Sequence, residues 1–170
     1  MDFPATAFTT KTNGYLRELL SEIFISPALS TLNEGQAPNP IQAKAVWDTG
    51  ATNTCISTQI TKKLNLLPIS KTQIASVNSI ETVNVYLVDI YLPNKVIIPN
   101  VRVSEPSALN SCDVLIGMDI IRLGDFSITN ADGHTWFSFR IPPAKKHIDY
   151  VVDANIENTL RNKKIKSSKQ

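Results

Sequence analysis

Hydrophobic and polar residues alternate along much of this chain, and this period of two constrains the fold more than any other feature. Successive side chains of a β-strand point to opposite faces, so such alternation predicts half-buried strands. Together with one short apolar run, the pattern predicts strands at residues 19–26, 43–47, 73–77, 80–90, 96–103, 112–116, 125–129 and 135–140. Turn residues recur between them, which is typical of a closed or sandwiched β-domain.

Helical signals are few and short. Ser57 is predicted to cap a helix that ends near Leu64, and Asn65 is expected to adopt the left-handed conformation that often ends a helix. A helical turn or two is expected over residues 118–123. The sequence therefore predicts a mainly β domain with one or two short helices.

Three regions are expected along the chain. Residues 1–18 read as an N-terminal extension, residues 19–143 as one domain, and residues 144–170 as a basic tail compatible with one amphipathic helix. The formal charge of +2 is small, and the basic excess lies at the end of the tail, where solvated charge is the ordinary explanation. We therefore expect no nucleic-acid partner.

The chain gives no sign of secretion or membrane insertion. No apolar stretch approaches the roughly 18 residues of a membrane span, and the N-terminus lacks the pattern of a signal peptide, so a cytoplasmic location is expected. Cys55 and Cys112 are expected to be reduced and mostly buried. Because His134 and His147 lie in turn-like and tail contexts, a cysteine nucleophile activated by histidine is disfavoured.

The strongest local motif is Asp48-Thr49-Gly50-Ala51, which follows directly after the apolar strand at 43–47. A carboxylate at the end of a buried strand is costly unless it is hydrogen-bonded or paired, and a glycine allows close approach of another backbone or of a substrate. Asp and Gly are also common turn residues, so the motif by itself is equally compatible with a hairpin turn.

A second segment, Leu115-Ile116-Gly117, follows about seventy residues later as an apolar strand ending in glycine. With Asp48-Thr49-Gly50-Ala51, it resembles the paired motifs of the retropepsin-like aspartic peptidases. The Asp119-Ile120-Ile121 that follows is similar to the form seen in cellular and bacterial relatives. The resemblance covers roughly residues 19–143 and implies a closed, barrel-like acid-protease fold that acts as a two-fold homodimer.

The resemblance implies a role for each matching position. Asp48 would be the catalytic carboxylate, Thr49 would hydrogen-bond across the dimer axis, and Gly50 would leave room for the substrate. Ala51 would keep the wall of the cleft small, and Gly117 would let the strand behind the loop pack closely. For Asp119 we expect an interaction with free amides at a helix start.

The chemistry of this family needs two carboxylates, which share one proton and titrate as a pair. One acts as base on a bound water while the other donates to the scissile carbonyl. Because one Asp-Thr-Gly occurs in the 170 residues and no Asp-Ser-Gly does, the second Asp48 must come from another copy. The expected partners are that copy and an extended peptide, and no metal or cofactor is expected.

Two features depart from the viral pattern. Thr52 and Met118 replace an acid and a basic residue that pair in viral members, which suggests a different packing solution. The flap, the hairpin expected to close over the substrate, has no glycine, since none occurs between Gly50 and Gly117. The flap candidates are Val77, Asn78, Ser79 and Ile80.

Two other functions fit parts of the sequence. A non-catalytic dimer of the same fold, which binds peptides or only assembles, is favoured by the glycine-free flap. The run Asp48 to Thr52 also fits the loose phosphate loop of actin-like and sugar-kinase ATPases, but those proteins need two α/β lobes and strong helical periodicity, which this sequence lacks. Peptide hydrolysis and nucleotide binding would distinguish the three.

Overall fold

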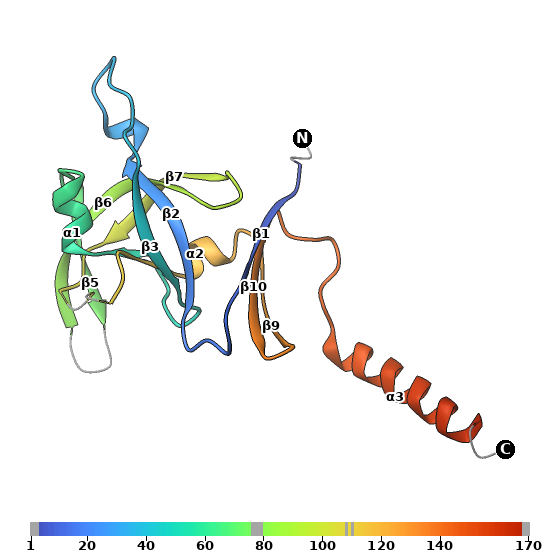
Figure 1. The fold of residues 1–170 in the computed structure, drawn as a ribbon. Helices are drawn as coiled ribbons and strands as arrows, with labels where there is room; N and C mark the ends of the chain where they lie inside the picture. The colour runs from blue at the N-terminus through green and yellow to red at the C-terminus, as the bar shows by residue number, and fades with distance from the viewer. Residues whose placement is uncertain (1–3, 76–79, 108, 110, 168–170) are drawn as a thin grey trace.

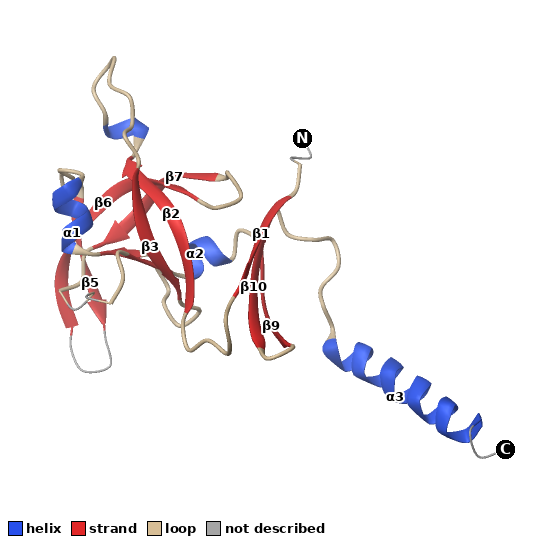
Figure 2. Ribbon diagram, viewed as in Figure 1, coloured by secondary structure: helices blue, strands red, loops and turns tan. Residues whose placement is uncertain are grey.

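The computed structural model describes residues 4–75, 80–107, 109 and 111–167, and these form a mainly β structure (Figures 1 and 2). The strands are β1 Thr6–Lys11, β2 Leu19–Pro27, β3 Ile41–Trp47, β4 Cys55–Ile56, β5 Ser70–Ala75, β6 Ile80–Tyr91, β7 Ile97–Ser104, β8 Val114–Ile116, β9 Asp125–Ala131 and β10 His134–Ile141. The helices are α1 Thr58–Lys63, α2 Met118–Ile121 and α3 Tyr150–Ser167, with a 3-10 turn at Leu29–Thr31. The predicted mainly β fold is confirmed.

The strands form two sheets. The larger has seven strands in the order β2-β3-β8-β4-β7-β6-β5, and β2 also pairs with β6, so the pairing returns to its starting strand. Most neighbours are antiparallel, but β3 and β8 run parallel, as do β4 and β7. The smaller sheet has the order β1-β10-β9 and lies beside the larger one (Figure 1).

The predicted strands are found with boundaries shifted by up to about three residues, as is usual for such signals. The turn expected at Asn78-Ser79 lies outside the described residues. Two strands were not predicted. β4 has two residues, too few for a pattern, and β1 has a single large apolar residue, Phe8, in the sequence Thr-Ala-Phe-Thr-Thr-Lys. β1 forms because its backbone pairs with β10, a partner distant in sequence.

The predicted helix after Ser57 is present as α1, with Ile60 buried against the core. Asn65 follows it with a φ of 49°, which confirms the expected left-handed helix end. One detail was wrong. Ser57 occupies the N-cap position, but its hydroxyl makes no capping hydrogen bond, and its Oγ is buried without a partner in the part of the chain that the structure describes. The backbone carbonyl of Ser57, and not its hydroxyl, bonds to the first turn of the helix: it accepts hydrogen bonds from the amides of Ile60 and Thr61.

An aromatic cluster joins the two sheets. Trp47, at the end of β3, contacts aromatic rings of the smaller sheet at centroid distances of 4.9 to 6.0 Å. The cluster consists of Trp47, Phe8, Phe126, Phe137 and Phe139. Burying rings of this size supplies much of the apolar surface that a domain needs. The residue immediately before Asp48 is therefore packed against both sheets.

The predicted tail helix is present as α3, which extends away from the sheets (Figure 1). Its apolar residues are not confined to one face: at 100° per residue, Val152, Ile156 and Leu160 form one stripe, while Val151 lies off it. None of the helices in the described residues is both long and apolar enough to span a membrane.

Candidate active site

Asp48 lies at the point where β3 ends. Its backbone amide donates to the carbonyl of Ile116 at 2.9 Å, which extends the parallel pairing of β3 with β8 by one bond. The side chain is half-buried. The apolar strand predicted to support the aspartate is thus its direct neighbour, although β8 follows β3 by nearly seventy residues in the chain.

The residues after Asp48 form a tight loop. The Gly50 amide donates to Asp48 Oδ1 at 2.8 Å, and the Ala51 amide donates to the Asp48 carbonyl at 3.2 Å. A Cβ at position 50 would lie 3.1 Å from Oδ1, so a side chain there would crowd the carboxylate. Thr49 and Gly50 are exposed, whereas Ala51 is half-buried. The loop therefore orients the carboxylate and leaves Thr49 and Gly50 accessible.

Gly117 lies directly behind this loop. A Cβ there would come within 2.7 to 2.9 Å of backbone atoms of Asn53 and Ala51, closer than real contacts allow. The two following amides bind the loop: Met118 N donates to the Ala51 carbonyl at 2.8 Å, and Asp119 N donates to the Thr52 carbonyl at 3.2 Å. The loop is thus joined to α2 through its backbone, at the two positions, Thr52 and Met118, that depart from the viral pattern.

A contact between Thr54 and Asp119 completes this support. Thr54 Oγ1 donates to Asp119 Oδ1 at 2.8 Å, and the Thr54 amide donates to Asp119 Oδ2 at 3.1 Å. Thr54 Oγ1 also accepts from the Gly117 amide at 3.2 Å. The expected bond from a helix-start amide is present as well, from Ile120 N to Asp119 Oδ1 at 3.0 Å. The sequence suggested that last bond but not the pairing with Thr54, whose residue type carries no such signal.

Trp47 fixes the other side of the loop. Its indole Nε1 donates to the hydroxyl of Ser21 on β2 at 2.8 Å, and both residues are buried. A buried indole N–H usually needs such a partner. With its ring held in the aromatic cluster and its N–H held by Ser21, Trp47 restrains the backbone that leads into Asp48.

A pocket of roughly 430 Å³ adjoins Asp48. It is formed by the segment before β2, the end of β3 and the β9–β10 hairpin, with polar and apolar side chains mixed. Its lining residues are Leu16, Arg17, Glu18, Leu19, Val46, Trp47, Asp48, Ile128, Asn130 and Thr135. A larger pocket, of roughly 700 Å³, lies against β1, β2 and β3 and includes none of the candidate site residues.

The structure brings Asp48, Thr49, Gly50 and Ala51 together with Ile116 and Gly117. Leu115 belongs to the same strand, where it pairs with Val46 and Cys55.

Of the four flap candidates, one belongs to the described residues. Val77, Asn78 and Ser79 lie outside the described residues. Ile80 begins β6 with 72% of its surface exposed.

The cysteines are free, as expected: Cys112 is buried and Cys55 is half-buried. Burial raises the pKa of both thiols, so they stay protonated at neutral pH. The Cys55 thiol contacts the Ser104 hydroxyl at 3.3 Å, and His134 Nδ1 contacts the Thr12 carbonyl at 2.5 Å. Neither of these contacts joins a cysteine thiol to a histidine imidazole, which is the pair that a histidine-activated nucleophile needs.

No protein-family model and no curated protein sequence matches the chain. Among solved structures, it is similar to a crystal structure of a retropepsin-like aspartic protease from Rickettsia conorii. The two chains are 10% identical with a TM-score of 0.52, and the match covers 83% of this chain and 98% of that one. At this identity the likeness concerns the fold, and the chain has a retropepsin-like fold.

Two further structures match less closely. The solution structure of Simian Foamy Virus (mac) protease is 17% identical, with a TM-score of 0.38 over 59% of this chain and 91% of that one. The retroviral protease-like domain of Ddi1 from Leishmania major is 14% identical, with a TM-score of 0.38 over 68% and 91%.

Proposed function

We propose that the chain is an aspartic endopeptidase that hydrolyses peptide bonds through a water activated between two Asp48 carboxylates, one from each subunit of a homodimer. The observation that carries the proposal is the asymmetry of the Asp48 loop. Its inner side is held by Ile116, Gly117 and α2, while Thr49 and Gly50 are exposed. A turn that merely closed a hairpin would not need this support from a distant strand.

Each residue of the loop has a part in this mechanism. Two Asp48 side chains on a two-fold axis would share one proton, so that one takes a proton from water and the other donates to the carbonyl oxygen. Thr49 is exposed and would bond across the axis to its copy, since its hydroxyl can donate and accept. Gly50 and Ala51 would line the cleft beside an extended peptide.

Cleavage of an unfolded protein at acidic pH tests the proposal. The wild-type chain is expected to cleave it and Asp48→Asn to lose at least a hundredfold in rate, because an amide cannot take the proton. Asp132→Asn is the matched control, since Asp132 is an exposed turn residue with a φ of 53° that Asn also tolerates. Unchanged cleavage by Asp48→Asn, or cleavage by a stable monomer, would refute the assignment.

A second function is favoured by one observation, the absence of glycine between Gly50 and Gly117. A flap without glycine brings side chains closer to a bound peptide backbone. The alternative is a non-catalytic dimer that binds extended peptides or only assembles. Tight peptide binding without hydrolysis over a broad pH range would support it, and hydrolysis that depends on Asp48 would eliminate it.

A further inference from the structure

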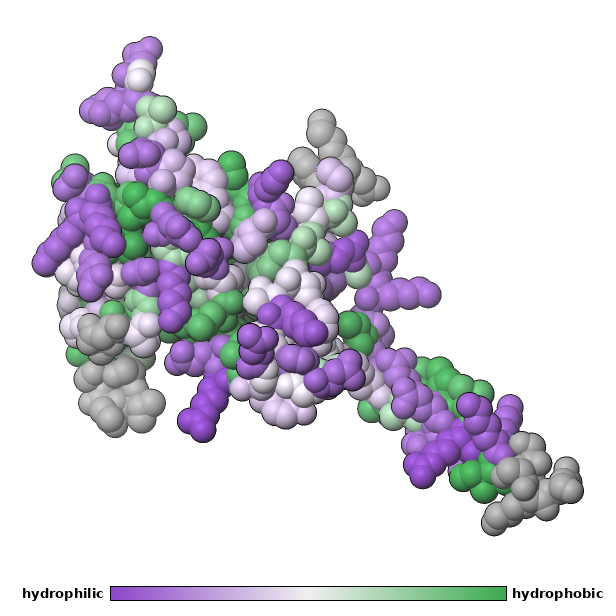
Figure 3. All heavy atoms as spheres, viewed as in Figure 1, coloured by the Kyte–Doolittle hydropathy of each residue, from purple (hydrophilic) through white to green (hydrophobic). Residues whose placement is uncertain are grey.

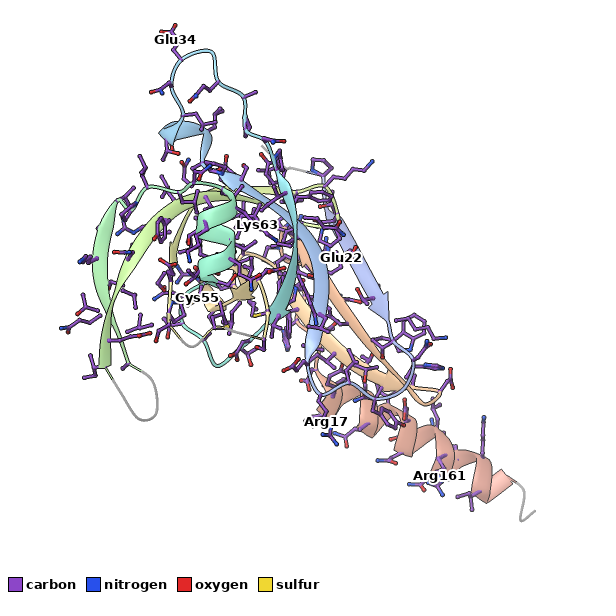
Figure 4. The ribbon with its side chains drawn as sticks, turned by 60° about the vertical axis from the view of Figure 1, so that its left-hand side comes forward. Arg17, Glu22, Glu34, Cys55, Lys63 and Arg161 are labelled. Atoms are coloured by element: carbon purple, nitrogen blue, oxygen red, sulfur yellow. The ribbon has the colours of Figure 1, made fainter. Side chains whose placement is uncertain are left out.

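The C-terminal helix α3 is the largest element without a packed face. Its residues 150–165 are all exposed, and the helix stands apart from both sheets (Figure 1). Arg161 marks the helix in Figure 4. An isolated helix of this length is marginal in water, and the β-branched residues Val151, Val152 and Ile156 do not favour it. Helices of this kind are normally stabilised by packing of an apolar stripe.

Such a stripe is present. Val152, Ile156 and Leu160 follow one another at intervals of four residues and are 50%, 54% and 54% exposed. With Asn155 and Thr159 they line a shallow groove formed by α3 alone. Figure 3 shows apolar surface on this helix between charged side chains. The stripe would lose its contact with water if another helix lay along it.

The order of charges along α3 matches that of a second copy of α3 in antiparallel orientation. Acidic residues occupy its first half, at Asp153 and Glu157, and basic residues its second half, at Arg161, Lys163 and Lys164. This order also suits the dipole of the helix itself. In a parallel pair of copies it sets like charges side by side, whereas in an antiparallel pair the acidic half of each copy meets the basic half of the other.

We propose that α3 packs antiparallel against α3 of a second copy of this chain, with the two-fold axis near Asn158. That register places Ile156 beside the partner's Leu160, so that the centres of the two stripes meet. Asp153 then lies level with the partner's Lys163 and one residue from the partner's Lys164. Of these two lysines, Lys164 lies on the flank of Asp153, since both residues are on one side of the stripe at 100° per residue.

The pairing supports a site that needs two chains. Two helices of this size bury less than the roughly 1,200 Å² of a stable interface, so α3 acts as an addition to contacts of the β-domain. The short segment 142–149 joins it to β10, and this tether raises the effective concentration of one β-domain near the other. This functional link rests on the proposed two-Asp48 mechanism, but the helix pairing itself does not.

Sedimentation of the full chain over a range of concentrations tests the apolar contact. Ile156→Gln/Leu160→Gln is expected to weaken the dimer at least tenfold, because it removes the centre of the stripe. Val151→Gln is the matched control: it is an exposed apolar residue of the same helix, off the stripe, and should leave the dimer unchanged. A wild-type chain that stays monomeric, or equal effects of the stripe and control variants, would overturn the proposal.

A charge exchange tests the orientation. At low ionic strength Asp153→Lys and Lys164→Asp are each expected to weaken the dimer several-fold, because each sets like charges together twice in a two-fold pair. The double variant restores opposite charges between copies and should recover wild-type affinity. A double variant no tighter than the single ones would rule out the antiparallel register.

The two proposals fail separately. Asp48→Asn should keep the wild-type dimer affinity and lose cleavage. A dimer that responds to the stripe variants but never cleaves peptides leaves the helix pairing standing and refutes the peptidase. Peptide cleavage by a dimer whose affinity is unchanged by the stripe variants supports the peptidase and refutes the helix pairing.

Discussion

Thr54 and Asp119 are joined by two hydrogen bonds, one from the Thr54 hydroxyl and one from its amide, each to a different oxygen of the carboxylate. Thr54 is fully buried, so neither donor can turn to water instead. The pair connects the loop after Asp48 with α2, and the Gly117 amide joins it through the Thr54 hydroxyl. The backbone amides of Met118 and Asp119 join the same loop to α2, and the Thr54–Asp119 pair adds side-chain hydrogen bonds to that connection.

Removal of the Asp119 carboxylate is therefore expected to be costly. Asp119→Ala leaves the buried hydroxyl and amide of Thr54 without acceptors, which should lower the free energy of unfolding by roughly 2–3 kcal/mol. Asp119→Asn retains one acceptor oxygen and should cost about half as much. Urea denaturation measures both, with Asp132→Asn as an exposed control that also tolerates the φ of 53° at that turn. If Asp119→Ala matched that control, the pair would contribute nothing to stability.

Gly117→Ala should disturb the backbone around Asp48. The new Cβ meets backbone atoms of Asn53 and Ala51, which cannot rotate away, so a loss of about 1–3 kcal/mol in unfolding free energy is expected. Gly50→Ala is the informative comparison, because its Cβ meets only the Asp48 carboxylate. We expect it to lower peptide cleavage with little change in stability. Denaturation midpoints and cleavage rates measured together separate the two effects.

Glu105 should make stability depend on pH in the acidic range. Burial raises the pKa of Glu105, but hydrogen bonds from the hydroxyls of Tyr86 and Thr61 lower it more, so the pKa lies below its ordinary value of 4.5. A depressed carboxylate pKa stabilises the fold above about pH 4.5, and this stabilisation is lost as the pH falls through the lower value in the folded state.

The matching measurement is the melting temperature of wild type and Glu105→Gln from pH 7 to pH 2. The wild type should melt higher at neutral pH, and the difference should shrink below pH 4.5. A difference that stayed constant down to pH 2 would mean that the ionised Glu105 is not the stabilising form.

Phe8→Ala tests the contribution of β1. Phe8 packs edge-on against Phe137 at 5.5 Å and also contacts Trp47, so its truncation should cost roughly 2 kcal/mol, less than for a fully buried ring. Thr9→Ser, at an exposed position of the same strand, keeps the hydroxyl that contacts Ser138 at 2.8 Å and should stay within about 0.5 kcal/mol of wild type. Hydrogen exchange of the β1 amides provides a local readout: they should exchange faster in Phe8→Ala. Unaltered exchange and stability would show that β1 does not depend on this ring.

The elements with strong periodicity could be predicted from the sequence because their patterns are local. β2, β3 and β6 alternate clearly, and Asn65 marks a helix end through its own backbone preference. β1 could not be predicted, since its stability comes from pairing with a distant strand. The Ser57 cap was wrong because burial of a hydroxyl depends on packing that composition does not reveal.

The candidate site also contains residues that the sequence predicts and a contact that it does not. Asp48 and Gly117 stand out through motif and spacing, and their proximity follows from the parallel pairing of β3 with β8. The contact of Thr54 with Asp119 joins residues 65 positions apart and has no sequence signature. It emerges only once β4 and β8 are placed side by side.

The aromatic packing before Asp48 also gives the chain an optical probe of its own. The sequence has two tryptophans, and Trp47 is 4% exposed, whereas Trp136 is half-buried near the amine of Lys11. The shielded Trp47 should therefore emit at the shorter wavelength and be quenched less by iodide. Since Trp47 is covalently next to Asp48, a change in its fluorescence would report displacement of the site without any added label.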